Sequence, residues 1–351
     1  MKNKKFFSAT LLSWNITDNT REMPWKGEKD PYKIWISEII LQQTRVNQGM
    51  SYYYKFIQSF PDIQTLAKSP EQLIFKHWEG LGYYSRCRNL IASAKFIQGN
   101  LRGKFPGNYD DILALKGVGN YTASAIASFA YNQPYAVVDG NVNRVLSRFF
   151  GLEMPIDTTE GKKLYTKLAG ELLDAKNPGI YNQAIMDFGA VVCKPTLPGC
   201  RSCPLNSRCV AFNKKMVSML PVKEKSIKRR KRFFTYLVVE YAGAFYVKER
   251  TAKDIWRGLY EFILIETKVI ATPKQVQKTG AFLSLIGDND FTITGISKTF
   301  SQKLTHQTIT GNFFHIRVEN PLIVGGKYSL VSKTQLEQLP FPKFINSYLK
   351  D

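Results

Sequence analysis

A cluster of four cysteines past the middle of the chain places the strongest constraint on how this sequence can fold. The spacers between neighbouring cysteines are six, two and five residues long, and the cysteines are Cys193, Cys200, Cys203 and Cys209. Where thiols are kept reduced, such a cluster predicts a metal site, and zinc is the general interpretation. Two short disulfides are the alternative. In either case the fold has to gather these four side chains in one place.

The excess of basic residues indicates a polyanionic partner. The chain has 49 Lys and Arg residues against 28 Asp and Glu residues, which gives a net charge of +21. Nucleic acid is the commonest partner of such a protein. An anionic membrane surface is the alternative, but no apolar stretch approaches the roughly 18 residues that span a bilayer. We therefore expect a nucleic-acid partner and no membrane.

The N-terminus has only part of the pattern of a signal peptide. It combines the basic residues MKNKK with the apolar stretch FFSATLL. The apolar run is interrupted at Ser13, Trp14 and Asn15, and no small-residue cleavage site follows. We expect the segment to form the first turns of an amphipathic helix and the protein to be cytoplasmic, with reduced thiols.

With 351 residues the chain is long enough for two domains. Residues 1–212 have the pattern of a mostly helical domain. Residues 213–232 contain few large apolar side chains and end in a basic block, which is typical of a linker, either a solvated tether or one that also contacts phosphates. Residues 233–351 predict an α+β domain. Helices of the first domain are expected at roughly 30–48, 71–79, 84–98, 110–115, 120–131, 141–150 and 158–175.

The second domain shows strand-like stretches. Ala242 and Gly243 separate FFTYLVVEY from AFYVKER, which predicts a β-hairpin. Further strands are expected at FILIE, FTIT and FFHIRV, and a helix at the final FPKFINSYLK. The predicted fold class is thus a helical domain followed by an α+β domain.

Residues 110–131 read DDILALKGVGNYTASAIASFAY and predict two helices joined by a tight turn over Lys116–Gly119. Gly117 and Gly119 let the backbone turn sharply and approach another chain closely. The free N–H groups of such a turn, beside the start of a helix, suit a phosphate oxygen. The pattern L-x-G-V-G is that of a helix–hairpin–helix motif, although Gly-x-Gly turns can also serve only to pack helices. We expect this turn to bind a nucleic-acid backbone.

Two carboxylates lie in contrasting sequence surroundings. Glu38 lies in the apolar stretch IWISEIIL, where a carboxyl group resists ionisation and can act as a general acid. The alternative, which periodicity alone favours, places Glu38 on a solvent face with Lys33, Ser37 and Thr44. Asp139 precedes a helix and suits an N-cap, where the helix dipole keeps it ionised. A protonated acid and a persistent anion are the pair that cleavage of an N-glycosidic bond needs.

Longer stretches resemble one enzyme family. MPWKGEKDPYKIWISEIILQQTRV (23–46), WEGLGYYSRCRNL (78–90), LKGVGNYTA (115–123) and VVDGNVNRVLSR (137–148) are similar to stretches of the MutY-type adenine DNA glycosylases. The resemblance covers nearly the whole chain and is strongest over 20–212. The cysteine spacing resembles the iron–sulfur loop of the wider endonuclease III superfamily. This implies a [4Fe–4S] cluster, with a structural role expected before a redox role, on Cys193, Cys200, Cys203 and Cys209.

The resemblance also implies catalytic residues. Glu38 is expected to protonate N7 of a flipped adenine and later to activate water, and Asp139 to stabilise the oxocarbenium-like sugar. Tyr121 and Asn141 match active-site positions that support this chemistry. Glycosylases with an associated lyase activity have a lysine at the position of Tyr121, so the reaction is expected to be hydrolytic and monofunctional.

The same resemblance implies contacts with the duplex. Gln43, Leu81 and Tyr83 match residues that contact the opposite base or wedge into the duplex beside it. Trp25 matches a position that lines the adenine pocket, and Lys26 stands where relatives often have arginine. For Leu81 and Trp25, simple core packing is the alternative.

The second domain resembles the MutT-like, Nudix-fold domain of the same family. The stretch WRGLYEF (256–262) is similar to the family's W-x-G-L-W-E-F, and the Glu-rich catalytic box of Nudix hydrolases is missing, so pyrophosphatase activity is not expected. Relatives recognise 8-oxoguanine with a Phe-Ser-His-like element. Thr305 and His306 are the expected readers in this chain, and Ser301 is the alternative.

These features together imply an enzyme that removes adenine mispaired with 8-oxoguanine or guanine from double-stranded DNA. We expect it to work as a monomer and to associate with the nucleoid through DNA. One alternative is a bifunctional endonuclease III-like enzyme for oxidised pyrimidines, against which Tyr121 argues. The other is a non-catalytic DNA-binding protein, against which the pair Glu38 and Asp139 argues.

Overall fold

The computed structural model describes residues 2–224, 229–286 and 289–351. The chain divides into two compact units. Unit 1 consists of Met1–Lys68 and Asn89–Lys225, and unit 2 consists of Ser69–Arg88 and Ser226–Asp351. Residues 225–228, which belong to the expected linker, lie outside the described residues. Within the described ranges, no helix is both long enough and apolar enough to cross a membrane.

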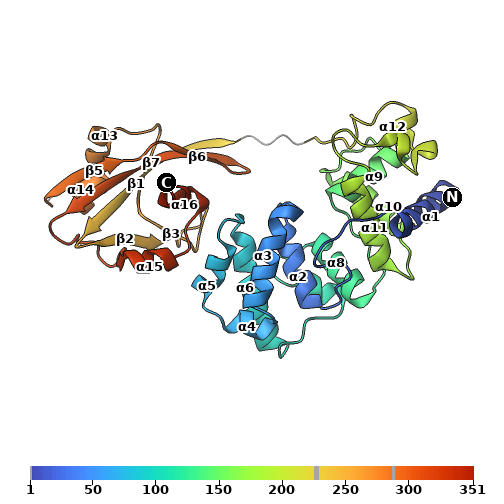
Figure 1. The fold of residues 1–351 in the computed structure, drawn as a ribbon, viewed down its shortest axis with the longest axis horizontal. Helices are drawn as coiled ribbons and strands as arrows, with labels where there is room; N and C mark the ends of the chain where they lie inside the picture. The colour runs from blue at the N-terminus through green and yellow to red at the C-terminus, as the bar shows by residue number, and fades with distance from the viewer. Residues whose placement is uncertain (1, 225–228, 287–288) are drawn as a thin grey trace. The chain divides into compact units, whose positions relative to one another are not determined.

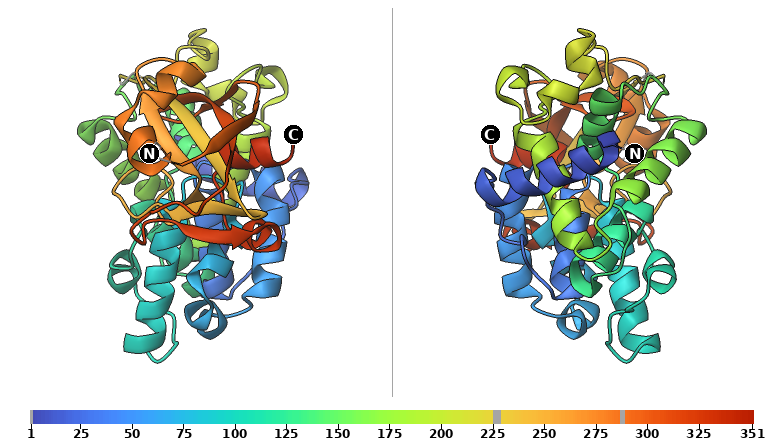
Figure 2. Two further views of the ribbon diagram at one scale, coloured as in Figure 1. Left: turned by 90° about the vertical axis from the view of Figure 1, so that its left-hand side faces the viewer. Right: turned by 90° about the vertical axis from the view of Figure 1, so that its right-hand side faces the viewer.

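Unit 1 is helical, as predicted (Figure 1). Four of its helices, α1, α9, α10 and α11, pack around buried Phe7, Leu146, Tyr165 and Phe188, and α1 lies against α11 (Figure 2, right). The helices are α1 (Lys2–Thr17), α2 (Pro31–Leu41), α3 (Val46–Ser59), α4 (Ile63–Lys68), α6 (Ser85–Asn100, which begins in unit 2), α7 (Tyr109–Leu113), α8 (Asn120–Tyr131), α9 (Gly140–Phe150), α10 (Thr159–Leu172), α11 (Pro178–Val191), the short η1 (Cys200–Ser202) and η2 (Asn206–Arg208), and α12 (Val210–Asn213).

The helix expected over 30–48 is shorter than predicted. Asp30 caps α2 with its side chain, as predicted, but the helix ends at Leu41. Gln43 has a φ of 58°, a left-handed conformation that a right-handed helix cannot contain. A separate helix, α3, then begins at Val46, and the sequence analysis did not predict it.

The first part of the expected linker packs on unit 1. Leu220 is 2% exposed, and its carbonyl accepts a hydrogen bond from Arg148 Nε at 3.0 Å. The carbonyl of Val222 accepts a hydrogen bond from the amide of Ile156 at 3.1 Å. This stretch is therefore fixed to the helices by burial and hydrogen bonds rather than being a solvated tether.

Unit 2 contains an eight-stranded mixed sheet within its described residues (Figure 1; Figure 2, left). The central strand β1 pairs in parallel with β7 and antiparallel with β2 and β4. Strand β7 also pairs with β5 and β6, and β2 with β3 and β8. The elements are α5 (Glu71–Trp78), β1 (Arg230–Tyr241), β2 (Ala244–Glu249), β3 (Tyr260–Glu261), β4 (Ile263–Thr267), α13 (Pro273–Gln277), α14 (Gly280–Ile286), β5 (Phe291–Ile296), β6 (Phe300–Lys303), β7 (Gln307–Val318), β8 (Ser329–Ser332), α15 (Lys333–Gln338) and α16 (Lys343–Leu349).

The elements predicted for this unit are confirmed. Ala242 and Gly243, with φ of 47° and 78°, form the two-residue turn between β1 and β2, because hairpin turns of this length favour positive φ. The other predicted strands correspond to β4, β5 and β7, and the predicted terminal helix is α16. A helical part and an α+β part, the predicted fold class, are therefore both present.

Candidate active site

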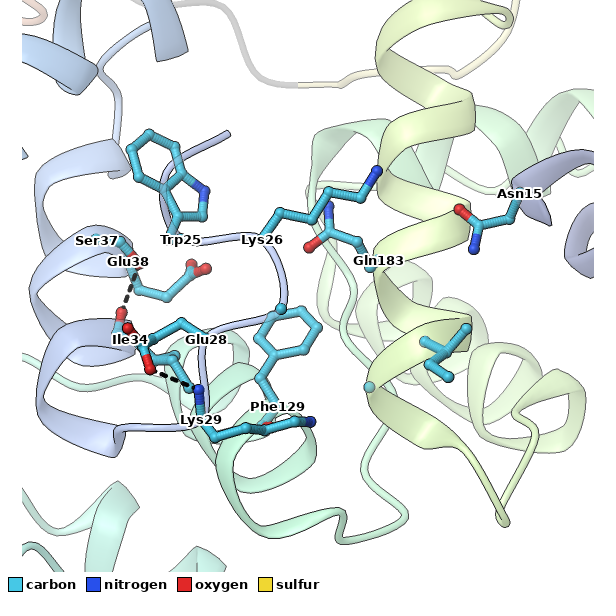
Figure 3. Close-up of a pocket in the computed structure, with 13 residues that line it drawn as sticks. Asn15, Trp25, Lys26, Glu28, Lys29, Ile34, Ser37, Glu38, Phe129 and Gln183 are labelled. Atoms are coloured by element: carbon cyan, nitrogen blue, oxygen red, sulfur yellow. Dashed lines mark hydrogen bonds between the residues drawn. The ribbon is translucent and has the colours of Figure 1, made fainter. Parts of the chain in front are cut away.

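A cavity of about 190 Å³ lies in unit 1, with walls from α2, the last turns of α8, α11 and the loop that joins α1 to α2. Figure 3 shows Glu38 reaching toward it from α2, Trp25 and Lys26 on the loop, and Gln183 on α11. Cavities for drug-sized ligands usually measure roughly 300–1,000 Å³. This smaller cavity suits a molecule of the size of a single nucleobase.

Glu38 is buried, so the alternative that placed it on a solvent face is wrong. Its exposed fraction is 4%, and that of Ser37 is 1%. Burial raises the pKa of Glu38 to about 7, hydrogen bonding by Tyr121 lowers it, and the charge of Asp139 raises it. Its Oε2 atom has no hydrogen-bond partner among the described residues. The carboxyl group can therefore hold a proton near neutral pH and give it to a bound molecule.

Asp139 is the N-cap of α9, as predicted. Its Oδ1 accepts a hydrogen bond from the Val142 amide, and its Oδ2 accepts one from Asn141 Nδ2, both at 2.7 Å. Burial raises the pKa of Asp139 and outweighs these hydrogen bonds and the charge of Arg144, which lower it. The sequence argument considered only the helix dipole and so left out the effect of burial.

Tyr121 lies in the first turn of α8. Burial and the charges of Glu38 and Asp139 raise the pKa of its phenol well above the usual value. The hydroxyl therefore stays protonated and can donate a hydrogen bond toward Glu38. The structure thus brings these three predicted residues into electrostatic contact.

Arg144 links Asn141 to the cysteine loop, and the sequence analysis did not identify it. Its Nη2 donates to Asn141 Oδ1 at 2.8 Å, and its Nε donates to the Cys193 carbonyl at 2.7 Å. Arg144 is 8% exposed although it lies in the middle of a helix. The signal that could have found it is a basic residue among the apolar residues of a helix.

Lys26, which was predicted to contact DNA, is close to a buried carboxylate. Its Nζ lies 3.2 Å from Oδ2 of Asp187, a residue of α11 that is 0% exposed. Gln183, one turn earlier on α11, donates a hydrogen bond to the same carboxylate. The sequence analysis missed both residues, although an acid within the apolar stretch AIMDFGAVV is a signal that it could have used.

Trp25 both packs in the core and lines the cavity. It is 8% exposed, and its ring centroid lies 5.3 Å from that of Tyr53 in an edge-on arrangement. Trp25 therefore packs in the core, as the alternative had it, and also lines the cavity, while its place in an adenine pocket stays a prediction.

The four predicted cysteines line one small pocket beside α12. All four are free thiols, so the disulfide alternative is wrong. Arg148, on α9, donates to Cys193 Sγ at 3.5 Å and to the carbonyl of Lys194 at 2.7 Å. Half-buried thiols that line one pocket beside an arginine form a donor set that suits a metal cluster.

The chemistry of this donor set can be compared with a [4Fe–4S] cluster. Burial and the charges of the other cysteines raise the pKa values of Cys200, Cys203 and Cys209, and a bound cation reverses such shifts by favouring thiolates. Among the described residues, no three His, Cys, Asp or Glu side chains converge closely enough to hold a single metal ion. An iron–sulfur cluster is held by four cysteine thiolates. Four thiols that line one pocket are the donor type that such a cluster takes.

The predicted helix–hairpin–helix turn lies between α7 and α8. Gly117 has a φ of +82°, and a Cβ atom there would lie 2.6 Å from Asn89 Cβ, so only glycine fits. Gly119 is the N-cap of α8 and has no side-chain cap. The first amides of α8 are therefore suitably placed for an acceptor from outside the chain, such as a phosphate oxygen.

A second pocket lies within unit 2, between residues 80–88 and the turn from β6 to β7. Leu81, Tyr83, Thr305 and His306 line it, and the hydroxyls of Tyr83 and Thr305 are hydrogen-bonded to each other. Ser301, on β6, is not among the residues that line this pocket, and it is exposed. The structure therefore gathers the preferred readers and two predicted duplex contacts, and leaves the alternative reader outside.

Two predicted duplex contacts have unusual backbones. Gln43 and Tyr83 have φ of 58° and 48° although neither is glycine, and both are exposed. Such conformations cost free energy and cluster at functional sites.

Comparison with known proteins gives family matches for both units. Residues 36–169 match the model of the HhH-GPD superfamily of base excision DNA repair proteins, and residues 235–351 match that of the NUDIX domain.

Two relatives named adenine DNA glycosylase and one solved structure of another DNA glycosylase illustrate the similarity. The adenine DNA glycosylase of Buchnera aphidicola subsp. Schizaphis graminum is 38% identical over 75% of this chain and 76% of its own length. That of B. aphidicola subsp. Baizongia pistaciae is 35% identical over 86% of this chain and 84% of its own length. A solved structure of a thermostable thymine-DNA glycosylase is 32% identical, with a TM-score of 0.57, and the match covers 61% of this chain and 98% of that chain.

Proposed function

Because this chain belongs to the MutY-type adenine DNA glycosylases, enzymes of base excision repair, we propose that it hydrolyses the N-glycosidic bond of adenine mispaired with 8-oxoguanine or guanine in double-stranded DNA. The observation that carries the proposal is the buried acid Glu38 in a cavity of nucleobase size. Asp139 lies near enough to raise the pKa of that acid. An acid that is protonated near neutral pH beside a second carboxylate is the arrangement that glycosidic cleavage requires.

In the proposed mechanism the adenine is flipped out of the duplex into the cavity. Glu38 transfers its proton to N7, the bond from C1′ to N9 breaks, and its electron pair passes to the base. The ionised form of Asp139 stabilises the positive charge that develops on the sugar, while Asn141 holds its Oδ2. Water then adds to C1′ and returns a proton to Glu38. Atoms balance as adenine, an abasic site and the restored enzyme.

The amide of Gln183 accounts for the choice of adenine. In the major groove, adenine offers the acceptor N7 beside the donor N6–H, whereas guanine offers two acceptors. Glu38 supplies the proton for N7. Gln183 uses its Nε2 as donor to Asp187 at 2.9 Å, so its Oε1 is the end that can accept from N6–H.

The pocket in unit 2 is proposed to read the base opposite the adenine. 8-Oxoguanine differs from guanine by an oxygen at C8 and a hydrogen at N7, so a reader needs hydrogen-bonding groups for that edge. Thr305 and His306 supply a hydroxyl and an imidazole at the turn between β6 and β7. Tyr83, which is hydrogen-bonded to Thr305, and Leu81 are proposed to contact the duplex there, and Gln43 to contact it from unit 1.

The chemistry is proposed to be monofunctional, because Tyr121 cannot form the Schiff base that a lyase step needs. Borohydride trapping on an abasic duplex tests this point. The wild-type protein should give essentially no trapped complex, and Tyr121→Lys should gain one. Efficient trapping of the wild-type protein would instead favour the endonuclease III-like alternative.

A [4Fe–4S] cluster is proposed to bind Cys193, Cys200, Cys203 and Cys209. When bound, it would cross-link the loop that carries these ligands and so add to folding stability. The protein's own part is to hold the loop through Arg148 and Arg144. Purified protein should contain about four irons per chain and absorb broadly near about 400 nm, as cluster thiolate ligation predicts. A colourless protein with one zinc per chain contradicts this proposal.

The work is proposed to be divided between a helical glycosylase domain (1–212) and a lesion-recognition domain (233–351), joined by a basic linker (213–232). The protein is proposed to act as a monomer on nucleoid DNA in the cytoplasm, since nothing in the chemistry calls for a second copy. The decisive test of the function is single-turnover base release from duplexes that pair adenine with 8-oxoguanine, guanine or thymine. Release from the first two and little from the third is the expected result. No release from any of them overturns the proposal.

A further inference from the structure

One carboxylate outside the proposed catalytic pair organises the wall of the cavity. Asp187 is 0% exposed on α11, accepts three hydrogen bonds and forms an ion pair with Lys26. Its Oδ1 accepts from Arg21 Nη1 at 2.7 Å and from Gln183 Nε2 at 2.9 Å. Its Oδ2 accepts from Asn19 Nδ2 at 3.0 Å and lies 3.2 Å from Lys26 Nζ.

These donors come from two parts of unit 1. Asn19, Arg21 and Lys26 belong to the loop between α1 and α2, and Lys26 Nζ also donates to the Arg21 carbonyl at 2.8 Å. The same loop carries Trp25, which lines the cavity. An ionised carboxylate has about four lone-pair sites and no donor. Its four partners therefore occupy all the sites of Asp187, and three of them, Asn19, Arg21 and Lys26, join the loop to α11.

The same carboxylate decides which end of the Gln183 amide turns toward the cavity. An amide can be reversed at little cost in shape, and its orientation follows from its hydrogen bonds. Because ionised Asp187 can only accept, it selects the Nε2 end. Figure 3 shows the Gln183 side chain reaching from α11 toward Lys26, with its amide oxygen on the side where Glu38 lies.

We infer that Asp187 is a positioning residue for base selection: through its hydrogen bonds it fixes Gln183 with the oxygen toward the base, and it holds the loop of Trp25 and Lys26 against α11. The inference rests on the proposed function, since it concerns the same cavity. The ligand class is an aminopurine, a base whose exocyclic N–H donor lies beside a ring nitrogen that can take a proton. Guanine, with an oxygen at that position, faces the amide oxygen and is disfavoured.

The test compares Asp187→Asn with wild type on two bases opposite 8-oxoguanine: adenine, and purine, which lacks the exocyclic amino group. An amide at position 187 can donate as well as accept, so it no longer selects one end of Gln183. The ratio of single-turnover rates, adenine over purine, should therefore fall roughly 10-fold, as expected for one lost base contact. A merely structural role lowers both rates together and leaves the ratio unchanged, and that result overturns the inference.

Rescue by a second substitution sharpens the test. Combining Asp187→Asn with Gln183→Glu restores one carboxylate between the loop cations, and both oxygens of that carboxylate can accept from the base. The adenine-over-purine ratio should return to within a few-fold of wild type, since the lost contact is restored. Gln183→Glu alone places two carboxylates side by side and should be slower than the double variant. A double variant no better than either single variant contradicts the inference.

Folding and function are separated by two further measurements. Urea unfolding of each variant identifies loss of the fold, and Gln183→Leu, which keeps Asp187 intact, must lose the same ratio. The control Glu171→Gln removes only an exposed ion pair with Lys4 and should change neither rate. If wild type releases no adenine, the proposed function fails. If wild type releases adenine but both Asp187→Asn and Gln183→Leu keep the ratio, this inference and the proposed role of Gln183 fail, while the proposed glycosylase activity stands.

Discussion

The cavity in unit 1 and the pocket in unit 2 hold their polar side chains in different ways. In unit 1 the carboxyl groups of Glu38, on α2, and Asp139, at the start of α9, are buried, and burial raises their pKa values. Around Thr305 the groups come from a turn between strands and remain partly exposed. Chemistry needs fixed geometry and tuned acidity, whereas recognition of a base needs accessible donors and acceptors. The comparison teaches that the proposed catalysis and the proposed lesion recognition should be separable by mutation.

The largest effect is expected for Glu38→Gln, which should stop base release and leave binding to the mispair near wild type. The amide keeps the shape but cannot donate a proton to the base or activate water. General acid–base catalysis is worth roughly 10²- to 10⁴-fold, and both roles are lost, so single-turnover rates should fall about 10³-fold or more. Glu160→Gln, a change at an exposed acid at the start of α10, is the control. Retention of more than about a tenth of the wild-type rate contradicts a role in general acid catalysis.

The next effect concerns the pocket in unit 2. Thr305→Ala combined with His306→Ala should weaken the preference for adenine opposite 8-oxoguanine over adenine opposite guanine by roughly 10-fold or more, because a good base contact is worth about 1–3 kcal/mol. Single-turnover release from a saturated adenine–guanine duplex should change little. Ser301→Ala, at the exposed position outside the pocket, is the matched control. If the double variant keeps its preference and Ser301→Ala loses it, the reader lies on β6 instead.

The smallest effect is the pH dependence of the single-turnover rate, which is expected to depend on groups of the cavity in unit 1 and not on the pocket in unit 2. The pKa of Glu38 is raised to about 7, and only the protonated form is the acid. The single-turnover rate should therefore fall as the pH rises through about 7, to a value roughly tenfold lower at about pH 8 than at about pH 6. Toward acid pH a second decline is expected, because burial raises the pKa of Asp139, which must stay ionised. The preference for adenine opposite 8-oxoguanine over adenine opposite guanine should not change with pH in this way. If it did, the cavity in unit 1 and the pocket in unit 2 would be coupled.

The parts of the fold that depend on local patterns could be predicted from the sequence. The hairpin at Ala242–Gly243, the cap at Asp30 and the turn at Gly117 each follow from the conformations that these residues favour. The break after Leu41 could not, because it lies between polar residues with no glycine or proline to mark it. Helix α11 was missed because it opens on Pro178–Gly179, a dipeptide typical of turns.

Residues of the candidate site could be predicted only where they belong to a recognisable sequence motif. Family resemblance pointed to Glu38, whereas periodicity favoured a solvent face, because α2 is covered on all sides and has no exposed stripe for a periodic pattern to reveal. Arg144 and Asp187 were missed, since their partners Cys193 and Arg21 lie 49 and 166 residues away and only the tertiary fold brings them together. A charged residue within an apolar stretch signals that the charge is buried, but a single sequence does not say which distant residue pairs with it.

The left-handed backbone of Gln43 has a consequence for laboratory evolution. Holding a residue other than glycine in this conformation costs roughly 1–2 kcal/mol, and Gln43 is exposed with a φ of 58°. A selection for heat resistance alone should therefore accumulate glycine at this position, since the change relieves strain and removes no core contact. Because Gln43 is proposed to contact the duplex, selection for a low mutation rate in a growing population should keep the glutamine. Growing one library under both selections would therefore measure how much thermal stability the enzyme loses by keeping glutamine in this conformation.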